Sequence, residues 1–399
     1  MTRRFCGAAN PGCSRLSAVS LLVAVLLATA PSAPAQGTTK AASEWFMYIG
    51  TYTNQQSKGI YAYRFQSAGK FTPLGLVAET SSPSFLVVDH NQKFVYAANE
   101  LSTYEGRPAA SISAFAIDAA TGQLKLLNRV SSKGPGACHV SLDETGKWLF
   151  AANYNGGSLA VFPVHEDGSL GEASAFIQHS GSSVDRQRQS GPHAHSAYVS
   201  PGNGFVLAAD LGLDRVMVYR LDAAKGTLTA NEPPFAKLAP GSGPRHLAFG
   251  KDGKFVYVLS EMLATVTVFS YNASAGSLTQ TQTISMLPGD YTGPKSAAEI
   301  AVHPNGKFLY ASHRGDSSIA IFRIDAGTGA LTAAGHVSTQ GKTPRNFAID
   351  PTGAFLLAAN QDSGSIVAFR IDQATGALTP TGDTLNVASP VCIVFARVR

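Results

Sequence analysis

The chain has 399 residues and a formal net charge of +5, and charged residues make up only 14% of it. The first 35 residues contain three arginines and no acidic residue, so the rest of the chain is close to neutral. The sequence has no basic patch or charge run of the kind that binds nucleic acid, and we expect no such partner. A chain of this length usually forms several domains, unless it folds as one large β-architecture.

The N-terminus has the pattern of an export signal. Two arginines near the start precede an apolar stretch at 16–30, which is followed by Ala-Pro-Ala at 33–35. Basic residues, a short apolar core and a small-residue cleavage site are the parts of a secretory signal peptide, and the apolar stretch is short for a bilayer span. We therefore predict a signal peptide at 1–35, a linker at 36–45, and a periplasmic or secreted protein that has no membrane contact after cleavage.

One sequence unit recurs through the remaining chain. A proline opens an apolar run, and about ten residues later a second run follows, such as Lys-Phe-Val-Tyr-Ala-Ala-Asn at Lys93 to Asn99. The unit recurs about every 50 residues. One copy begins at Ala297 without a proline, and the others begin with a proline. The prolines are Pro83, Pro135, Pro192, Pro244, Pro344 and Pro390. This period and the short β-rich runs are typical of a β-propeller with four strands per blade.

Two further strands complete each copy. In the first copy they are Ser111 to Asp118 and Leu124 to Val130, joined by a turn in which Gly122 supplies the positive φ of a tight hairpin. Six full copies are followed by a lone first strand at 390–398, and the three missing strands match 46–52, 59–65 and 71–79. We predict an all-β, seven-bladed β-propeller over 46–399, closed by N- and C-terminal strands in one blade. Cys138 and Cys392 lie in blades that are not neighbours, so we expect free thiols.

The topology brings polar residues to one mouth of the central channel. The first strand of each blade runs along the channel and the second returns, so the start of one and the end of the other share a face. First-strand starts supply Cys138-His139, His193, His195, Arg245-His246, Glu299 and Arg345-Asn346, and second-strand ends supply Asn99-Glu100, Asn153-Tyr154, Asp210, Glu261, His313-Arg314 and Asn360-Gln361. Ionisable groups that converge at one opening shift each other's pKa values, as sites require.

Some of these residues have a structural interpretation instead. Asn and Asp at strand ends often stabilise turns, which applies to Asn99, Asn153, Asp210 and Asn360. His193 and His195 have a spacing that could hold zinc, but no third ligand pattern accompanies them, and we predict neither metal nor cofactor. The polar insertion 181–191, with Arg186 and Arg188, is either a solvated excursion or a lid.

Six motifs along the chain carry a family resemblance. They are Asn-Tyr-Asn-Gly-Gly-Ser at 153–158, Pro-His-Ala-His at 192–195, Asp-Leu-Gly-Leu-Asp-Arg at 210–215, Gly-Pro-Arg-His at 243–246, Ala-Glu at 298–299 and His-Arg-Gly at 313–315. Together they resemble the seven-bladed β-propeller lactonase family, which includes 6-phosphogluconolactonases and an enzyme that cyclises 3-carboxymuconate. The resemblance covers residues 46–399.

The resemblance implies roles for individual residues. His195 matches the family's proposed catalytic histidine, Arg245 and Arg314 match its two arginines, and Glu261 matches its glutamate. Around these four we expect a second group of substrate-binding residues, namely His139, Glu100, Glu299 and Arg345.

These residue types suit the hydrolysis of an acidic or sugar-type lactone. Opening a lactone requires a base that activates water and a positive field for the oxyanion, and arginine binds carboxylate or phosphate with a planar fork. Either Glu261 or His195 is the base, and the sequence does not choose between them. A lactonising cycloisomerase of the muconate type and a non-enzymatic binding propeller are the alternatives, since fold does not establish function. We expect a small-molecule lactone as partner, unphosphorylated if the protein is exported, and a monomer or dimer.

Overall fold

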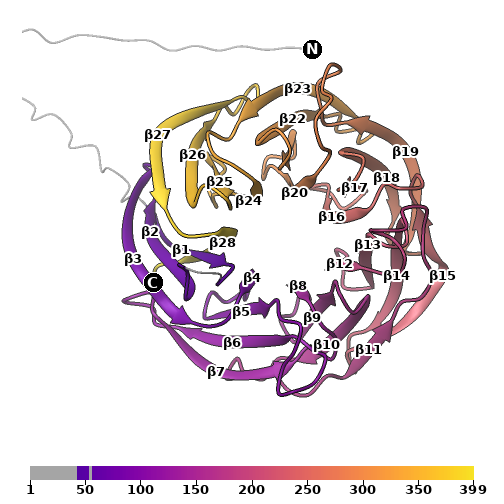
Figure 1. Ribbon diagram of the computed structural model, residues 1–399, viewed down its shortest axis with the longest axis horizontal. Coiled ribbons are helices and arrows are strands. Elements are labelled where there is room, and N and C mark those ends of the chain that lie inside the picture. Colours follow the sequence, from indigo (N-terminus) through magenta and orange to yellow (C-terminus); the bar gives the residue numbers. More distant parts are fainter. Residues whose placement is uncertain (1–42, 54–55) are drawn as a thin grey trace, which may run out of the picture. The chain divides into compact units, whose positions relative to one another are not determined.

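The computed structural model describes residues 43–53 and 56–399. In this part of the chain, 28 strands form seven four-stranded antiparallel sheets arranged in a ring (Figure 1). The predicted signal peptide at 1–35 lies outside the described residues. The first strand begins at Glu44, so the end of the predicted linker belongs to the propeller. None of the described residues belongs to a helix that could cross a membrane.

The first four blades follow one another along the chain. Blade 1 consists of β4 (Pro83–Val88), β5 (Phe94–Asn99), β6 (Ser111–Ile117) and β7 (Leu124–Ser131). Blade 2 consists of β8 (Ala137–Leu142), β9 (Trp148–Asn153), β10 (Ser158–Pro163) and β11 (Ala175–Gln178). Blade 3 consists of β12 (Ala194–Val199), β13 (Phe205–Asp210), β14 (Arg215–Asp222) and β15 (Thr227–Lys237). Blade 4 consists of β16 (Pro244–Phe249), β17 (Phe255–Ser260), β18 (Thr265–Asn272) and β19 (Ser277–Ser285).

Two more blades precede the closing one. Blade 5 consists of β20 (Ala297–Val302), β21 (Phe308–His313), β22 (Ser318–Ile324) and β23 (Leu331–Ser338). Blade 6 consists of β24 (Pro344–Ile349), β25 (Phe355–Asn360), β26 (Ser365–Ile371) and β27 (Leu378–Asn386). Blade 7 consists of β28 (Pro390–Arg397), β1 (Glu44–Thr51), β2 (Gly59–Gln66) and β3 (Lys70–Glu79).

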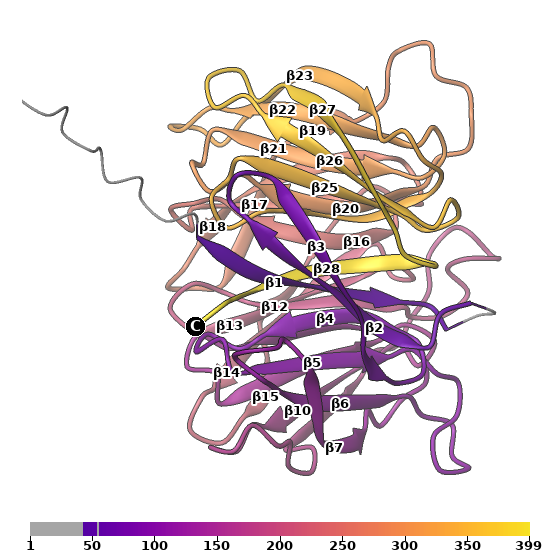
Figure 2. The ribbon, with the colours of Figure 1, turned by 90° about the vertical axis from the view of Figure 1, so that its left-hand side faces the viewer.

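Blade 7 joins the two ends of the propeller. Its innermost strand, β28, pairs antiparallel with β1, from Trp45 opposite Arg397 to Thr51 opposite Pro390. Figure 2 shows the yellow β28 lying beside the indigo β1. The predicted closure is therefore confirmed. Cys392 of this strand and Cys138 are both buried and free, as expected.

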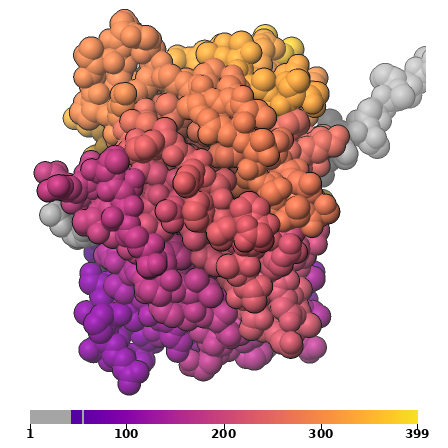
Figure 3. Space-filling view, turned by 90° about the vertical axis from the view of Figure 1, so that its right-hand side faces the viewer, coloured from indigo at the N-terminus to yellow at the C-terminus, as the bar shows by residue number. Residues whose placement is uncertain are grey.

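Burial differs systematically from the first strand to the fourth. The second strands are almost wholly buried, because each is covered by neighbouring strands and by the next blade, and this explains their near-continuous apolar runs. The fourth strands alternate or are mostly exposed, as in β19 and β23. They form the outer wall, on which successive blades follow one another as bands of colour (Figure 3).

The hairpin glycines lock neighbouring blades together. In all seven blades, the glycine of one hairpin turn packs on an aromatic ring of the adjacent blade so closely that a Cβ there would lie 2.2 to 2.8 Å from a ring atom. The pairs are Gly122–Phe46, Gly168–Phe94, Gly226–Trp148, Gly276–Phe205, Gly329–Phe255, Gly376–Phe308 and Gly69–Phe355. These glycines therefore serve both the turn, through positive φ, and the packing between blades.

Candidate active site

An irregularity at the start of each first strand determines which side chains face the channel. In all seven blades, the pairing of the first and second strands shifts register there. Such bulges re-aim a side chain. The second residues of the first strands are Ser84, Cys138, His195, Arg245, Ala298, Arg345 and Val391. Cys138, His195, Arg245 and Arg345 from this set line one end of the channel.

A second ring comes from the residue that follows each second strand. In every blade, the backbone N–H of this residue donates to the carbonyl of the residue that precedes the first strand. The residue therefore occupies the same position in all seven blades. Glu100, Tyr154, Glu261 and Arg314 occupy this position and line the same end of the channel. Tyr52 occupies it in blade 7 and donates to Glu100 Oε2 at 2.8 Å.

The two rings enclose a cavity of about 200 Å³ at the channel mouth. It is lined by Glu100, Cys138, Tyr154, Arg188, His195, Glu261, Arg314 and Arg345. Five of these residues, Glu100, His195, Glu261, Arg314 and Arg345, were predicted to be catalytic or substrate-binding. The sequence placed Cys138 and Tyr154 at this mouth without giving them a role, and it named Arg188 only as part of the insertion 181–191.

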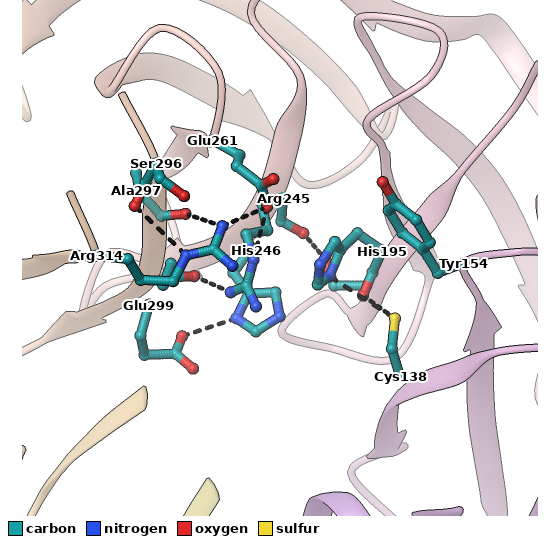
Figure 4. Close-up of polar contacts among 12 residues, drawn as sticks. Cys138, Tyr154, His195, Arg245, His246, Glu261, Ser296, Ala297, Glu299 and Arg314 are labelled. Atoms are coloured by element: carbon teal, nitrogen blue, oxygen red, sulfur yellow. Dashed lines mark hydrogen bonds and ion pairs between the residues drawn. The ribbon is translucent and has the colours of Figure 1, made fainter. Parts of the chain in front are cut away.

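Glu261 is the electrostatic centre of the cavity. Arg188 Nη2 lies 2.7 Å from its Oε1. Arg245 Nε at 3.2 Å and Arg314 Nη2 at 3.0 Å share its Oε2 (Figure 4). Burial alone would raise the pKa of Glu261, but Arg314, Arg245 and Arg188 lower it to about 2. Glu261 is therefore a carboxylate at any physiological pH, and it holds three guanidinium groups in place.

Arg345 is the cavity's unneutralised cation. Its guanidinium lies 5.2 Å from the ring centroid of Tyr52, and it makes no hydrogen bond or ion pair with any described residue. Burial disfavours its charge, but Tyr52, Glu100 and Glu261 raise its pKa. The cavity thus has more arginines than carboxylates, and Arg345 has donors available to an anion.

His195 faces the same cavity as a neutral imidazole. It lies between Cys138, whose Sγ is 3.3 Å from the His195 carbonyl oxygen, and the ring of Tyr154, 5.3 Å away between centroids (Figure 4). Burial lowers the pKa of His195 well below 6.5, and the charges of Arg245 and Arg345 lower it further. Burial also raises the pKa of the Cys138 thiol, so Cys138 is not a thiolate nucleophile.

Two predicted site residues lie deeper than expected. His139 and Glu299 follow the bulge position by one residue, so their side chains point into the layer beneath the cavity and do not line it. Glu299 Oε1 accepts a bond from His246 Nδ1 at 2.9 Å, and its Oε2 accepts one from Asn346 at 2.6 Å. His139 packs between Phe85 and Tyr198. Glu299 lines a separate, water-sized void together with Arg245 and His246.

Four of the residues that end second strands make contacts within the fold. Asn99, Asn153 and Asn360 donate to backbone carbonyls of nearby turns, and Asp210 accepts from His179 at 2.6 Å. His193 precedes β12 and its Nδ1 bonds the carbonyl of Tyr154, so it does not share a strand face with His195. Within residues 43–53 and 56–399, no three His, Cys, Asp or Glu side chains are arranged to hold a metal ion.

Comparison with known proteins assigns the family. The family model "Lactonase, 7-bladed beta-propeller" matches residues 46–395. The 6-phosphogluconolactonase of Bacillus subtilis is 36% identical over 305 residues, which are 76% of this chain and 84% of the relative. The solved structure of the periplasmic gluconolactonase of Pseudomonas aeruginosa is 35% identical with a TM-score of 0.84, covering 90% of this chain and all of that one. A solved structure from Bacteroides fragilis is 40% identical with a TM-score of 0.83, covering 90% and 99%. This chain belongs to the seven-bladed β-propeller lactonase family.

Proposed function

We propose that the protein hydrolyses an acidic or sugar-type lactone in the cavity at the channel mouth, with His195 as the general base. The observation that carries this proposal is a neutral, buried histidine that faces a cavity with an excess of arginines. Glu261 is the poorer candidate, because a carboxylate that three arginines hold at a pKa of about 2 has little affinity for a proton.

The proposed steps follow from these positions. His195 removes a proton from water as the water oxygen attacks the lactone carbonyl carbon, and the carbonyl electrons move onto oxygen. Arg345 and Arg314 stabilise that oxyanion, because both are charged in a largely buried site. When the tetrahedral intermediate collapses, the ring C–O bond breaks and protonated His195 returns the proton to the leaving oxygen. The product is the open-chain hydroxy acid.

The test is pH-stat hydrolysis of a panel of glucono-, galactono-, 6-phosphoglucono- and muconolactone, with and without chelator. His195→Gln and Arg245→Ala should each lower kcat/KM by about a hundredfold or more. His165→Gln, an exposed histidine in the turn between β10 and β11, is the matched control and should match the wild type. Full activity of His195→Gln would reject the assignment of the base.

The panel also tests the alternatives. Formation of the lactone from a muconate-type acid, faster than its hydrolysis, would favour a cycloisomerase with the same site. No turnover of any of these lactones would favour a non-enzymatic binding propeller.

We further propose that the protein is exported, as its N-terminal pattern indicates. Mass spectrometry of the protein from a periplasmic extract should find a mature chain that begins near Gln36. A cytoplasmic protein that retains residues 1–35 would contradict this.

A further inference from the structure

The loop between β11 and β12 carries two arginines in different environments. Arg188 Nη2 donates to Glu261 Oε1 at 2.7 Å and to Tyr154 Oη at 3.1 Å. Arg186 is exposed and makes no hydrogen bond or ion pair with any described residue. The arginine side chains around Glu261 are 44%, 15% and 3% exposed for Arg188, Arg314 and Arg245. Arg188 therefore stands at the rim of the cavity and the other two stand progressively deeper.

A buried carboxylate holds this loop in place. Asp214 accepts hydrogen bonds from Ser183 Oγ at 2.5 Å and Gln189 Nε2 at 2.8 Å, both in the loop. It also accepts bonds at 2.7 Å from the N–H groups of Gly241 and Gly243, and Gly243 immediately precedes the strand that carries Arg245. One side chain thus fixes the loop of Arg188 relative to the strand of Arg245, so the rim arginine is preorganised.

Arg188 has donors to spare at this position. A guanidinium has five N–H donors, and only Nη2 of Arg188 is engaged with described residues, through Tyr154 and Glu261. Its Nε and Nη1 have no acceptor among those residues. Since the deeper Oε2 of Glu261 is shared by Arg245 and Arg314, the rim arginine is the one whose free donors lie nearest to solvent.

We propose that Arg188 selects lactones that carry a second anionic group, a phosphate or a carboxylate, remote from the lactone carbonyl. This inference rests on the proposed function, because a lactone carbonyl placed beside His195 and Arg345 leaves the far end of the substrate at the rim. A planar guanidinium binds both anionic groups through paired hydrogen bonds, and the charge assistance makes these bonds strong. A neutral sugar lactone gains much less from the same donors.

The experiment compares two pairs of lactones that differ within each pair only at C6: glucono-1,5-lactone with 6-phosphoglucono-1,5-lactone, and glucono-1,4-lactone with glucaro-1,4-lactone. The ratio of kcat/KM for each anionic lactone to that for its neutral partner measures selectivity. Arg188→Gln should lower at least one ratio about tenfold or more, chiefly through KM, and the ratio that falls identifies phosphate or carboxylate. Arg188→Lys should restore part of it. Arg186→Gln removes the same charge from the same loop, but Arg186 makes no hydrogen bond or ion pair with any described residue, so this variant should leave both ratios unchanged.

Other outcomes would overturn the inference. A wild type without preference for either anionic lactone over its neutral partner would do so, as would equal losses on the anionic and neutral lactones in Arg188→Gln. If Arg188→Gln melts well below the wild type, Arg188→Lys is compared with the wild type instead. Selectivity ratios equal to those of the wild type would then reject the proposed paired hydrogen bonds from the guanidinium. If the wild type hydrolyses neither these lactones nor any other lactone of the panel, the proposed function fails, and calorimetry with 6-phosphogluconate, glucarate and gluconate tests the inference separately. If the wild type binds 6-phosphogluconate or glucarate more tightly than gluconate and Arg188→Gln loses this preference, the role of Arg188 is supported. Equal affinities of the wild type for the three acids would reject it.

Discussion

His195 is neutral at physiological pH because burial, and then the charges of Arg245 and Arg345, lower its pKa. A lowered pKa keeps the base form populated to a more acidic pH than usual, so the acid limb of kcat/KM should lie below pH 6.5. Arg345→Met removes one of these charges without breaking an ion pair. The pKa of His195 should rise and the acid limb should move to higher pH, whereas an unmoved limb would show that another group titrates.

Glu261 links the site to stability. Its pKa is about 2 in the folded protein against an ordinary value of 4.5, so its contribution to stability is complete above pH 4.5 and is lost as the pH falls towards 2. Between about pH 5 and pH 3, the urea midpoint of the wild type should therefore fall more than that of Glu261→Gln. At neutral pH, the variant should lose about 3 kcal/mol or more, because three arginines are left without their carboxylate.

An exposed ion pair provides the control for that experiment. Glu172 binds Lys133 at 2.8 Å on the surface, where such pairs contribute little. Glu172→Gln makes the same chemical change and should leave the urea midpoint and its pH dependence almost unaltered. Equal effects of the two substitutions would mean that the arginine cluster does not stabilise Glu261 as its geometry indicates.

At the scale of the element, the hairpin glycines join the blades. Gly226 has a φ of +64°, and a Cβ there would lie 2.2 Å from atoms of the Trp148 ring. Gly202 has a φ of +83° but open space around its Cβ position. Both alanine variants incur backbone strain of about 1 kcal/mol, and Gly226→Ala should lose a further 1 to 3 kcal/mol or so by displacing the ring. The difference between the unfolding free energies of the two variants in urea measures the contribution of the close packing between Gly226 and Trp148. Equal unfolding free energies would contradict that contribution.

The sequence predicted the strands well because their signals are local. Apolar runs, turn glycines and a constant period establish each blade, and β4 to β7 lie almost where the first copy was placed. The depth of a polar side chain is not local in this way. The bulge at the start of each first strand aims Cys138 into the cavity and its neighbour His139 beneath it, whereas the sequence shows only two adjacent residues.

The sequence named Arg188 but left its insertion, 181–191, open as a solvated excursion or a lid. The insertion is not part of the repeating unit, so the repeat gave no position for the Arg188 side chain. What directs it to Glu261 is Asp214, a residue of another turn that binds Gln189 and Ser183. Contacts of this kind join segments far apart in the chain and have no period, and only the folded structure reveals them.

At the scale of the whole molecule, closure depends on β28. This innermost strand of blade 7 pairs with β1, its Ile393 N–H donates to Asn346 of blade 6 at 3.0 Å, and its Cys392 Sγ lies 3.3 Å from the Leu86 nitrogen of blade 1. Deleting residues 390–399 would leave β1 unpaired on its inner side and remove the link between blades 6 and 1. We therefore expect the truncated protein to lose cooperative unfolding in urea and all lactonase activity.

A shorter truncation separates the strand from the chain end. Val398 and Arg399 follow β28, and Val398 contributes a single backbone hydrogen bond, to Glu44. Removing these two residues should lower the urea midpoint only slightly and keep the transition cooperative, because β28 and its contacts with both neighbouring blades remain. If the protein without residues 390–399 still unfolds in one sharp transition, the six intact blades close on themselves. The pairing of the two termini would then be a consequence of the ring and not its cause.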